Sequence, residues 1–213
     1  LALEKYGQSF KTMAITINGN GTLTGVSVGG LPDGIVDNDM IASSTIAEAK
    51  LAANVNTITM ADKWALTGNF NLTNAETYYT ITGTWAKCTS AGHNTGTIGS
   101  SMTESSGVFT FPSTGIYYIV YDCITGTSND QVNMWSYITV GADNTSTNYL
   151  SVKASSGDSG SMNTVTHSGL LDVTDTSAQK IFVRGYTGNS GCYISGNGNL
   201  HRTQITFIRL GDT

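Results

Sequence analysis

Short segments of alternating hydrophobic and polar residues, separated by clusters of Gly, Ser and Asn, fill the sequence from about residue 77 onward. Such alternation is typical of β-strands with one buried face, and the separating residues favour tight turns. A series of strands at this spacing without intervening helices predicts an all-β sandwich or barrel. The segments are TYYTITGTWAKC, GVFTF, IYYIVYDCI, VNMWSYITV, NYLSVKA, NTVTHSGLLDV, AQKIFVRGY, GCYIS and TQITFIRL.

The charge pattern excludes several classes of partner. Only 12% of the 213 residues are charged, the net charge is −5, and the ten Lys and Arg residues are dispersed. Nucleic-acid binding needs clustered positive charge, so we expect none. No apolar run approaches the roughly 18–20 residues of a membrane span, so we expect no membrane insertion. Three widely spaced cysteines argue against a disulfide framework and favour assembly in a reducing cytoplasm, with Cys123 as a buried free thiol.

The N-terminal part has a different texture. Residues 1–12 look like a leader, an extension or a remnant, and a natural start follows at Met13. Alternating residues around NGNG (18–21) predict a β-hairpin. Thr45 and Glu48 fit a capping box, which predicts a short helix over about 46–54. Two helical turns need a packing partner, either from the same chain or from copies of it. We treat residues 13–76 as one N-terminal segment, for which trimerisation is one way to supply that partner.

The segment IYYIVYDCI (116–124) carries hydrophobic side chains on both faces. Ile116, Tyr118, Val120 and Ile124 point one way, and Tyr117, Ile119, Tyr121 and Cys123 point the other. Antiparallel sandwiches usually leave one face of each sheet in water. Because large apolar patches are rare on soluble monomers, the strand predicts a second covering surface, most simply a neighbouring subunit.

The pattern GVFTFPSTGIYYI (107–119) resembles the signature of the C1q/TNF-like jelly roll, which has Gly, Phe, Thr, Pro, Gly and Tyr at this spacing. The closing TQITFIRLGD (203–212) is similar to that family's last strand. The resemblance covers roughly residues 77–213 and implies a two-sheet jelly roll that assembles as a homotrimer. No collagen repeat precedes it, unlike in C1q. Aromatic and aliphatic residues would line the threefold axis, and we expect Tyr117, Ile119, Tyr121 and Phe207 at the trimer interface.

The segment INGNGTLTGVSVGGLPDGIVDNDMI (17–41) resembles N-terminal segments of bacteriophage tail-fibre and structural proteins, notably marine ones. This resemblance implies a virion protein without catalytic activity, assembled in the host cytoplasm. Residues 13–76 would bind other virion proteins, and residues 77–213 would form a receptor-binding head. The receptor would be a host-surface glycan or protein. The alternative is a capsid head fibre or decoration protein that stabilises the virion or attaches it to surfaces.

Candidate catalytic and metal sites are weak. GDSGS (157–161) matches the nucleophile segment of chymotrypsin-like proteases, but only His93 precedes Ser159, and its surroundings do not fit. The three histidines have no second ligand at metal-binding spacing. Asp37, Asp39 or Asp158 could ligate calcium, yet the complete calcium-loop pattern is absent. We therefore expect no enzyme, no metal site and no cofactor.

Loops rich in Asn, Asp and Ser are better binding candidates, because side-chain amides and hydroxyls pair with sugar hydroxyls. Plain solvated turns are the simpler interpretation of the same loops. Trp85, Trp135, Tyr137, Tyr186 and Tyr193 could stack on sugars, although packing is again the simpler interpretation. The predicted receptor-binding residues are Asn129, Asp130, Asn144, Asn148, Tyr149, Asp158, Asn189, Tyr193 and Asn197.

Overall fold

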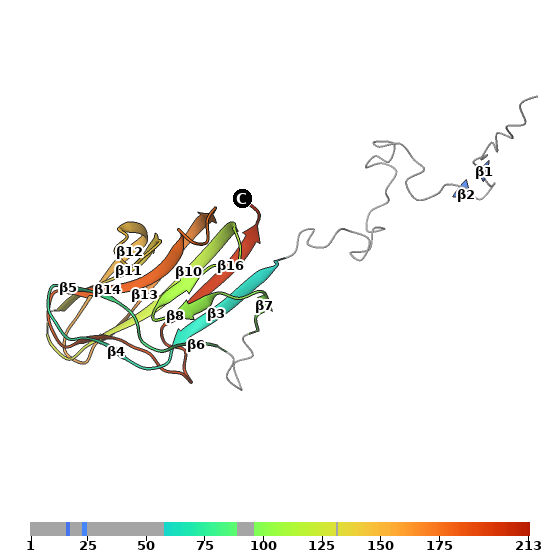
Figure 1. Ribbon diagram of the computed structural model, residues 1–213. Helices are drawn as coiled ribbons and strands as arrows, with labels where there is room; N and C mark the ends of the chain where they lie inside the picture. Colours follow the sequence, from blue (N-terminus) through green and yellow to red (C-terminus); the bar gives the residue numbers. More distant parts are fainter. Residues whose placement is uncertain (1–15, 18–22, 25–57, 89–95, 131) are drawn as a thin grey trace, which may run out of the picture. The chain divides into compact units, whose positions relative to one another are not determined.

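The computed structural model describes residues 16–17, 23–24, 58–88, 96–130 and 132–213 (Figure 1). The chain divides into two units, Leu1–Val55 and Asn56–Thr213. In the first unit, β1 (Thr16–Ile17) pairs antiparallel with β2 (Leu23–Thr24), which confirms the predicted hairpin. The predicted helix over 46–54 lies outside the described residues.

The second unit, which we call the head, contains two antiparallel sheets. The eight-stranded sheet has the order β4-β15-β10-β16-β3-β6, with β13 paired to β10 and β7 paired to β3. Its strands are β3 (Met60–Leu66), β4 (Phe70–Leu72), β6 (Trp85–Lys87), β7 (Ile98–Gly99), β10 (Gly115–Thr127), β13 (Met162–Val173), β15 (Cys192–Ile194) and β16 (Gln204–Gly211).

The six-stranded sheet has the order β12-β11-β14-β9-β8, with β5 paired to β14. Its strands are β5 (Thr77–Thr80), β8 (Thr103–Ser105), β9 (Val108–Thr110), β11 (Val132–Gly141), β12 (Asn148–Gly157) and β14 (Lys180–Thr187). Every segment that the sequence assigned to strands after residue 77 contains strand residues, but TYYTITGTWAKC is divided between β5 of the six-stranded sheet and β6 of the eight-stranded sheet. The all-β, two-sheet prediction is confirmed.

The head begins earlier than the sequence suggested. β3 and β4 precede residue 77 and belong to the eight-stranded sheet, where β3 pairs with both β16 and β6. β3 carries Asp62 and Lys63 at its centre, which hid its strand character. Asp62 is buried, and its Oδ2 accepts hydrogen bonds from Trp64 Nε1 at 3.0 Å and from the Met102 backbone N–H at 2.9 Å. The carboxylate therefore fastens the 101–102 loop to β3.

Aromatic side chains fill the space between the sheets. Phe109 of β9 lies with its ring centroid 5.4 Å from Trp85 and 5.4 Å from Phe207, both on the opposite sheet. Phe111 lies 4.6 Å from Tyr117. Burying large aromatic rings is the main favourable contribution such a sandwich has, because each removes a large apolar area from water.

Two glycines explain the spacing of the GVFTFPSTG pattern. Gly107 has φ +79°, and a Cβ there would lie 2.4 Å from the Ile81 carbonyl oxygen. Gly115 has φ +140°, and its Cβ would lie 2.6 Å from the Gly211 carbonyl oxygen. Side chains are excluded at both positions by conformation and by space. The two glycines thus bracket β9 and the turn into β10.

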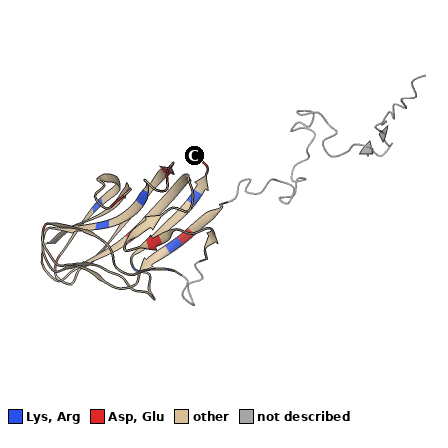
Figure 2. Cartoon of the chain, viewed as in Figure 1, with Lys and Arg blue, Asp and Glu red and all other residues tan. Residues whose placement is uncertain are grey.

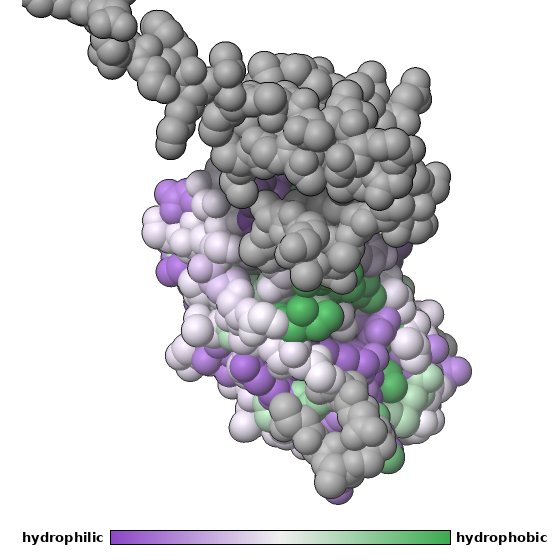
Figure 3. Space-filling view, turned by 90° about the vertical axis from the view of Figure 1, so that its right-hand side faces the viewer, coloured by the Kyte–Doolittle hydropathy of each residue, from purple (hydrophilic) through white to green (hydrophobic). Residues whose placement is uncertain are grey.

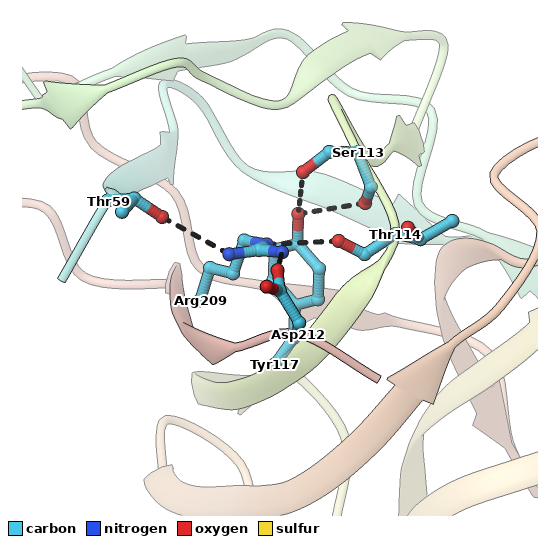
Figure 4. A network of polar contacts seen from close by, with 6 residues as sticks. All are labelled: Thr59, Ser113, Thr114, Tyr117, Arg209 and Asp212. Atoms are coloured by element: carbon cyan, nitrogen blue, oxygen red, sulfur yellow. Dashed lines mark hydrogen bonds and ion pairs between the residues drawn. The ribbon is translucent and has the colours of Figure 1, made fainter. Parts of the chain in front are cut away.

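A polar network joins this turn to the first and the last residues of the head (Figure 4). Arg209 Nε donates to the Thr114 carbonyl at 3.0 Å, Nη1 donates to Thr59 Oγ1 at 3.3 Å, and Nη2 pairs with Asp212. The Tyr117 hydroxyl donates to the Ser113 carbonyl at 3.0 Å. Because β3 begins and β16 ends here (Figure 1), we call this the entry end and the opposite side the distal end.

Candidate functional site

Three turns meet at the distal end of the head. The Ser159 backbone N–H, in the turn between β12 and β13, donates to Asp130 Oδ1 at 2.9 Å. Asn129 Nδ2 donates to the Ser190 carbonyl at 2.6 Å. The turns after β10, β12 and β14 are therefore fastened to one another. The fold brings together the predicted binding residues Asn129, Asp130, Asp158 and Asn189.

Tyr193 lies beside this loop cluster. It pairs with Gly126 in the register between β15 and β10, and its ring covers Gly126, where a Cβ would come within 2.3 Å of the ring. A hollow of about 270 Å³ lies next to it, lined by Asn71, Leu72, Thr73, Ser128, Gly191, Cys192 and Tyr193. The distal end thus has a polar rim and one half-buried tyrosine.

Asn144, Asn148 and Tyr149 lie at the entry end instead. Asn148 and Tyr149 line a second hollow of about 300 Å³ together with Leu150, Leu171 and Gln179. In the preceding loop, hydrogen bonds from the Thr145 hydroxyl and backbone N–H lower the pKa of Asp143. The nine predicted binding residues therefore do not form one site.

Asn197 has a structural task in the loop after β15. Its backbone N–H donates to the Leu66 carbonyl at 2.9 Å. Its Oδ1 accepts hydrogen bonds from the backbone N–H groups of Asn199 and Leu200 at 2.9 and 3.0 Å. This side chain already serves the turn, which is what Asn does in many loops.

The four residues expected at a trimer interface lie inside the head. Tyr117, Ile119, Tyr121 and Phe207 are all 0% exposed and belong to the core between the two sheets. The chain itself covers them completely. The face of β10 that stays partly exposed is the opposite one, with Ile116 and Tyr118.

That outer face of the eight-stranded sheet carries a row of hydrophobic residues in register. Leu170 pairs with Tyr118, Tyr118 with Ile208, Ile208 with Ala61, and Ala61 with Ile98. We call these five residues the apolar row. Its ends are open to solvent, since Leu170 is 63% and Ile98 48% exposed. Seen from the entry end, hydrophobic residues gather in a patch between hydrophilic ones (Figure 3).

A row of polar side chains crosses the same face at Asp122, four residues further along β10 than Tyr118. The Thr166 hydroxyl donates to Asp122 Oδ1 at 2.8 Å, and Gln204 Nε2 donates to Asp122 Oδ2 at 3.1 Å. The carboxylate is thus satisfied within the chain. Charged residues are sparse and scattered over the head (Figure 2).

The outer face of the six-stranded sheet carries aromatic residues instead. Trp135, Tyr186 and Tyr78 are neighbours in one cross-strand register over β11, β14 and β5, and we call them the aromatic row. Their ring centroids are 5.2 Å apart for Trp135 and Tyr186 and 4.7 Å apart for Tyr186 and Tyr78. Tyr137 and Tyr149 extend the group toward the entry end.

The aromatic residues that the sequence suggested for sugar stacking differ in how far they are buried. Trp85 is buried in the core, and Tyr137 is nearly buried beneath its aromatic neighbours. Trp135 and Tyr186 are half-exposed on the outer face. Tyr78, which the sequence reading did not single out, is the most exposed of the row at 61%. Period-two alternation places Trp135 and Tyr137 on one face, but only the register shows that Tyr186 and Tyr78 join them.

Catalytic chemistry finds little support in the described residues. The Ser159 hydroxyl donates to the Ser128 carbonyl at 2.9 Å, so it is held in a turn. Burial raises the pKa of Cys123 to about 12, which keeps that thiol protonated. All three cysteines are free and buried. In the part of the chain that the structure describes, no group of three or more His, Cys, Asp or Glu side chains is arranged for a metal ion.

His167 of β13 is fully buried and joins the two sheets. Its Nε2 lies 2.6 Å from Ser136 Oγ of β11, and its Nδ1 lies 3.0 Å from Ser151 Oγ of β12. Its ring stacks on Tyr121 at 5.4 Å. Burial, and next the charge of Lys153, lower the pKa of His167 to about 4, so the imidazole is neutral at neutral pH.

Comparison with known proteins addresses the fold. No family model matches the chain, and no curated protein matches it. Murine APRIL superposes with a TM-score of 0.52 at 12% identity, covering 71% of this chain and 98% of APRIL. Eiger TNF from S. frugiperda gives a TM-score of 0.50 at 16% identity, covering 74% and 96%.

A viral structure superposes with a lower TM-score. The PRD1 vertex protein P5 gives a TM-score of 0.46 at 15% identity, a likeness too low to carry a conclusion. Among the described residues there is also no helix with the length and apolar character that a membrane span requires. From the two sheets, their strand order and the likeness to APRIL and Eiger, the head has the TNF-like jelly-roll fold.

Proposed function

We propose that the chain is a non-enzymatic bacteriophage virion fibre protein whose head assembles as a homotrimer and binds a host-surface receptor. Two features support this: the resemblance of residues 17–41 to fibre proteins, and the jelly-roll head that follows them. The N-terminal unit, Leu1–Val55, is the part assigned to attachment on other virion proteins. Residues 58–76 belong to the head instead, since they contain β3 and β4.

The observation that carries the proposal is the apolar row on the outer face of the eight-stranded sheet. Five neighbouring strands contribute one hydrophobic residue each, and these line up in register. Leaving such an exposed strip in water is unfavourable, and covering it gains about 25 cal/mol per Å² of apolar area. Because the nearby Asp122 is already paired within the chain, a second copy can cover this face without leaving that charge unsatisfied.

The receptor contact is assigned to the distal end. Thr59, just before the first strand of the head, lies at the opposite end of the head from the distal loops. Asn129, Asp130 and Asn189 supply amide and carboxylate groups there, and Tyr193 supplies an aromatic ring. Three such ends on one rigid trimer would strengthen a weak single contact through avidity.

Light scattering of the purified full chain tests the assembly. The expected mass is about three times the chain mass of 22.4 kDa. A stable monomer at micromolar concentration would contradict the role given to the apolar row.

Cryo-electron microscopy of intact virions, combined with binding of the purified protein to host cells, tests the function. Density at the tail together with saturable cell binding is the expected result. Density on the capsid without cell binding would replace receptor attachment by capsid decoration. Absence of the chain from particles would overturn both.

A further inference from the structure

The hollow at the distal end is formed where β15 lies beside β4. The two strands pair Tyr193 with Asn71 and Cys192 with Leu72. Paired residues of antiparallel strands share a face, so the Tyr193 ring and the Asn71 amide lie side by side. Leu72 and Cys192 point to the opposite face, where both are buried. An aromatic ring and an amide therefore stand together above a closed floor.

The position of the Tyr193 ring depends on Gly126 of β10. The two residues pair in the register between β10 and β15. A Cβ at Gly126 would lie 2.3 Å from Tyr193 Cζ and 2.5 Å from its hydroxyl oxygen. The ring therefore leans from β15 toward β10, and the hollow of about 270 Å³ opens beside it.

The turns beside the hollow are fastened to one another within the chain. Ser128 donates from its backbone N–H and from its hydroxyl to the Gly191 carbonyl, each at 2.9 Å. Gly191 has φ +82°, and a Cβ there would lie 2.7 Å from Asn129 Nδ2, so this close approach requires glycine. A ligand would meet a wall that is already ordered, which lowers the entropy cost of binding.

The groups around the hollow are polar but uncharged. Asn71 contributes an amide, Thr73 and Ser128 contribute hydroxyls, and Tyr193 contributes a ring with a hydroxyl. None of the lining residues is acidic or basic. Within the part of the chain that the structure describes, the Asn71 amide and the Tyr193 hydroxyl have no hydrogen-bond partner. These two groups are therefore available to a ligand.

From this geometry we infer that the hollow binds one neutral sugar ring. The C–H face of the sugar would lie against the Tyr193 ring, since the negative face of an aromatic ring attracts such groups. The Asn71 amide both donates and accepts, so it matches two neighbouring sugar hydroxyls. The volume lies just below the range of about 300–1,000 Å³ that is usual for small-molecule sites, so it suits a single ring. The inference names the ligand class of the distal receptor contact and rests on the proposed function.

The charges at the distal end favour a neutral sugar over an acidic one. Asp130 and Asp158 stand in the adjoining turns after β10 and β12. A carboxylate on the ligand would approach these two carboxylates and find no cation in the lining of the hollow. Such a juxtaposition of like charges is unfavourable.

The hollow is separate from the apolar row. Gly126 lies eight residues beyond Tyr118 along β10, which is about 26 Å of strand. Self-association centred on the apolar row and sugar binding at the distal end can therefore take place on the same head.

The test uses the purified full chain and soluble probes, the methyl glycosides of glucose, galactose and mannose. Saturation-transfer NMR should show that at least one of them binds with a dissociation constant of about 1–10 mM, because one small hollow offers few contacts. The corresponding methyl uronides carry a carboxylate in place of the C6 hydroxymethyl group. Each should bind about tenfold more weakly than its neutral counterpart.

Four variants locate the site. Asn71→Ala removes an exposed amide and should weaken the best neutral probe about fivefold. Tyr193→Leu keeps an apolar side chain over Gly126 but removes the aromatic face, and it should weaken the same probe. The matched controls are Asn148→Ala and Tyr149→Leu, which alter an exposed Asn and an exposed Tyr at the entry end. Both should leave the affinity unchanged.

The outcomes separate this inference from the proposed function. No binding of any of the three neutral glycosides, or equal affinity for the uronides, overturns the neutral-sugar site. Unchanged binding in Asn71→Ala also overturns it. If host cells are bound although no glycoside binds, the fibre function stands and the inference fails. If a glycoside binds through Asn71 while host cells are not bound, the site stands and the receptor-binding function fails.

Discussion

The outer faces of the two sheets differ although both sheets cover the same core. On the eight-stranded sheet the apolar row runs straight across five strands, and a paired carboxylate lies nearby. On the six-stranded sheet the aromatic row adjoins Arg184, whose buried Nε and Nη2 have no hydrogen-bond partner among the described residues. The first face carries mainly aliphatic side chains, whereas the second carries aromatic rings beside an arginine. A shared core therefore leaves the chemistry of the two outer faces free to differ.

The largest expected effect is on the free energy of unfolding, and it comes from the core that both sheets cover. Phe207→Ala should lower the free energy of unfolding by about 3–5 kcal/mol, because it removes a fully buried ring and leaves a cavity. Ile208→Ala, one residue further and on the outer face, should cost clearly less when the unfolding is measured on monomeric protein. Equal losses in urea denaturation would mean that the two sides of β16 are not distinct.

A charge introduced into each row in turn should show which face takes part in self-association. Tyr118→Asp puts a carboxylate into the apolar row, and burying it against another copy without a partner costs about 3–5 kcal/mol. We expect light scattering to show the chain mass of 22.4 kDa for this variant. Tyr78→Asp, in the aromatic row, should keep the wild-type mass. A trimer that survives Tyr118→Asp would place the contact elsewhere.

Acid should loosen the joint between the two sheets. The pKa of His167 is about 4 in the folded chain, against an ordinary value of 6.5, so the unfolded chain binds the proton more readily. Stability is therefore full above about pH 6.5 and falls as the pH drops toward 4, by up to about 3 kcal/mol.

Denaturant unfolding at pH 7.5, 5.5 and 4.5 measures this effect. His167→Gln keeps polar groups near Ser136 and Ser151 and should flatten the difference between these pH values. His93 and His201 remain in the variant and serve as an internal control. If wild type and variant lose stability in parallel, His167 is not the titrating group.

The smallest expected effect is on the stability of the aromatic face. Tyr78→Ala should change the free energy of unfolding by no more than about 0.5 kcal/mol, as is usual for exposed positions. A larger loss in thermal denaturation would show that packing of Tyr78 against Tyr186 holds β5 on β14.

Strand alternation and turn residues were sufficient to predict the fold. They predicted the hairpin around NGNG and most strands after residue 77, because period-two patterns and Gly or Asn turns are local signals. The short strands β7 and β8 were not predicted, and the segment 77–88 was not recognised as two strands of different sheets. β3 was missed because the burial of Asp62 is possible only with hydrogen bonds from Trp64, Ser101 and Met102. Such tertiary compensation leaves no trace in a hydrophobic pattern.

The candidate site could be predicted only in part. Period-two alternation correctly indicated that both faces of 116–124 are apolar, but it could not tell the inner face from the outer one, because each carries tyrosine. Loop composition likewise could not show that Asn144 and Asn129 lie at opposite ends. The aromatic row needs the registers of three strands, so no single segment of sequence reveals it.

The network around Arg209 has a mechanical consequence for a fibre. Tension that enters at Thr59 and leaves through the distal loops runs along β3, perpendicular to the hydrogen bonds of its six register pairs with β16. Those pairs would have to slip together in shear, rather than open one after another as a zipper does. Arg209 also fastens the first loaded residue to Thr114 and pairs with Asp212, so the pull is shared by three segments before any strand pair bears it alone.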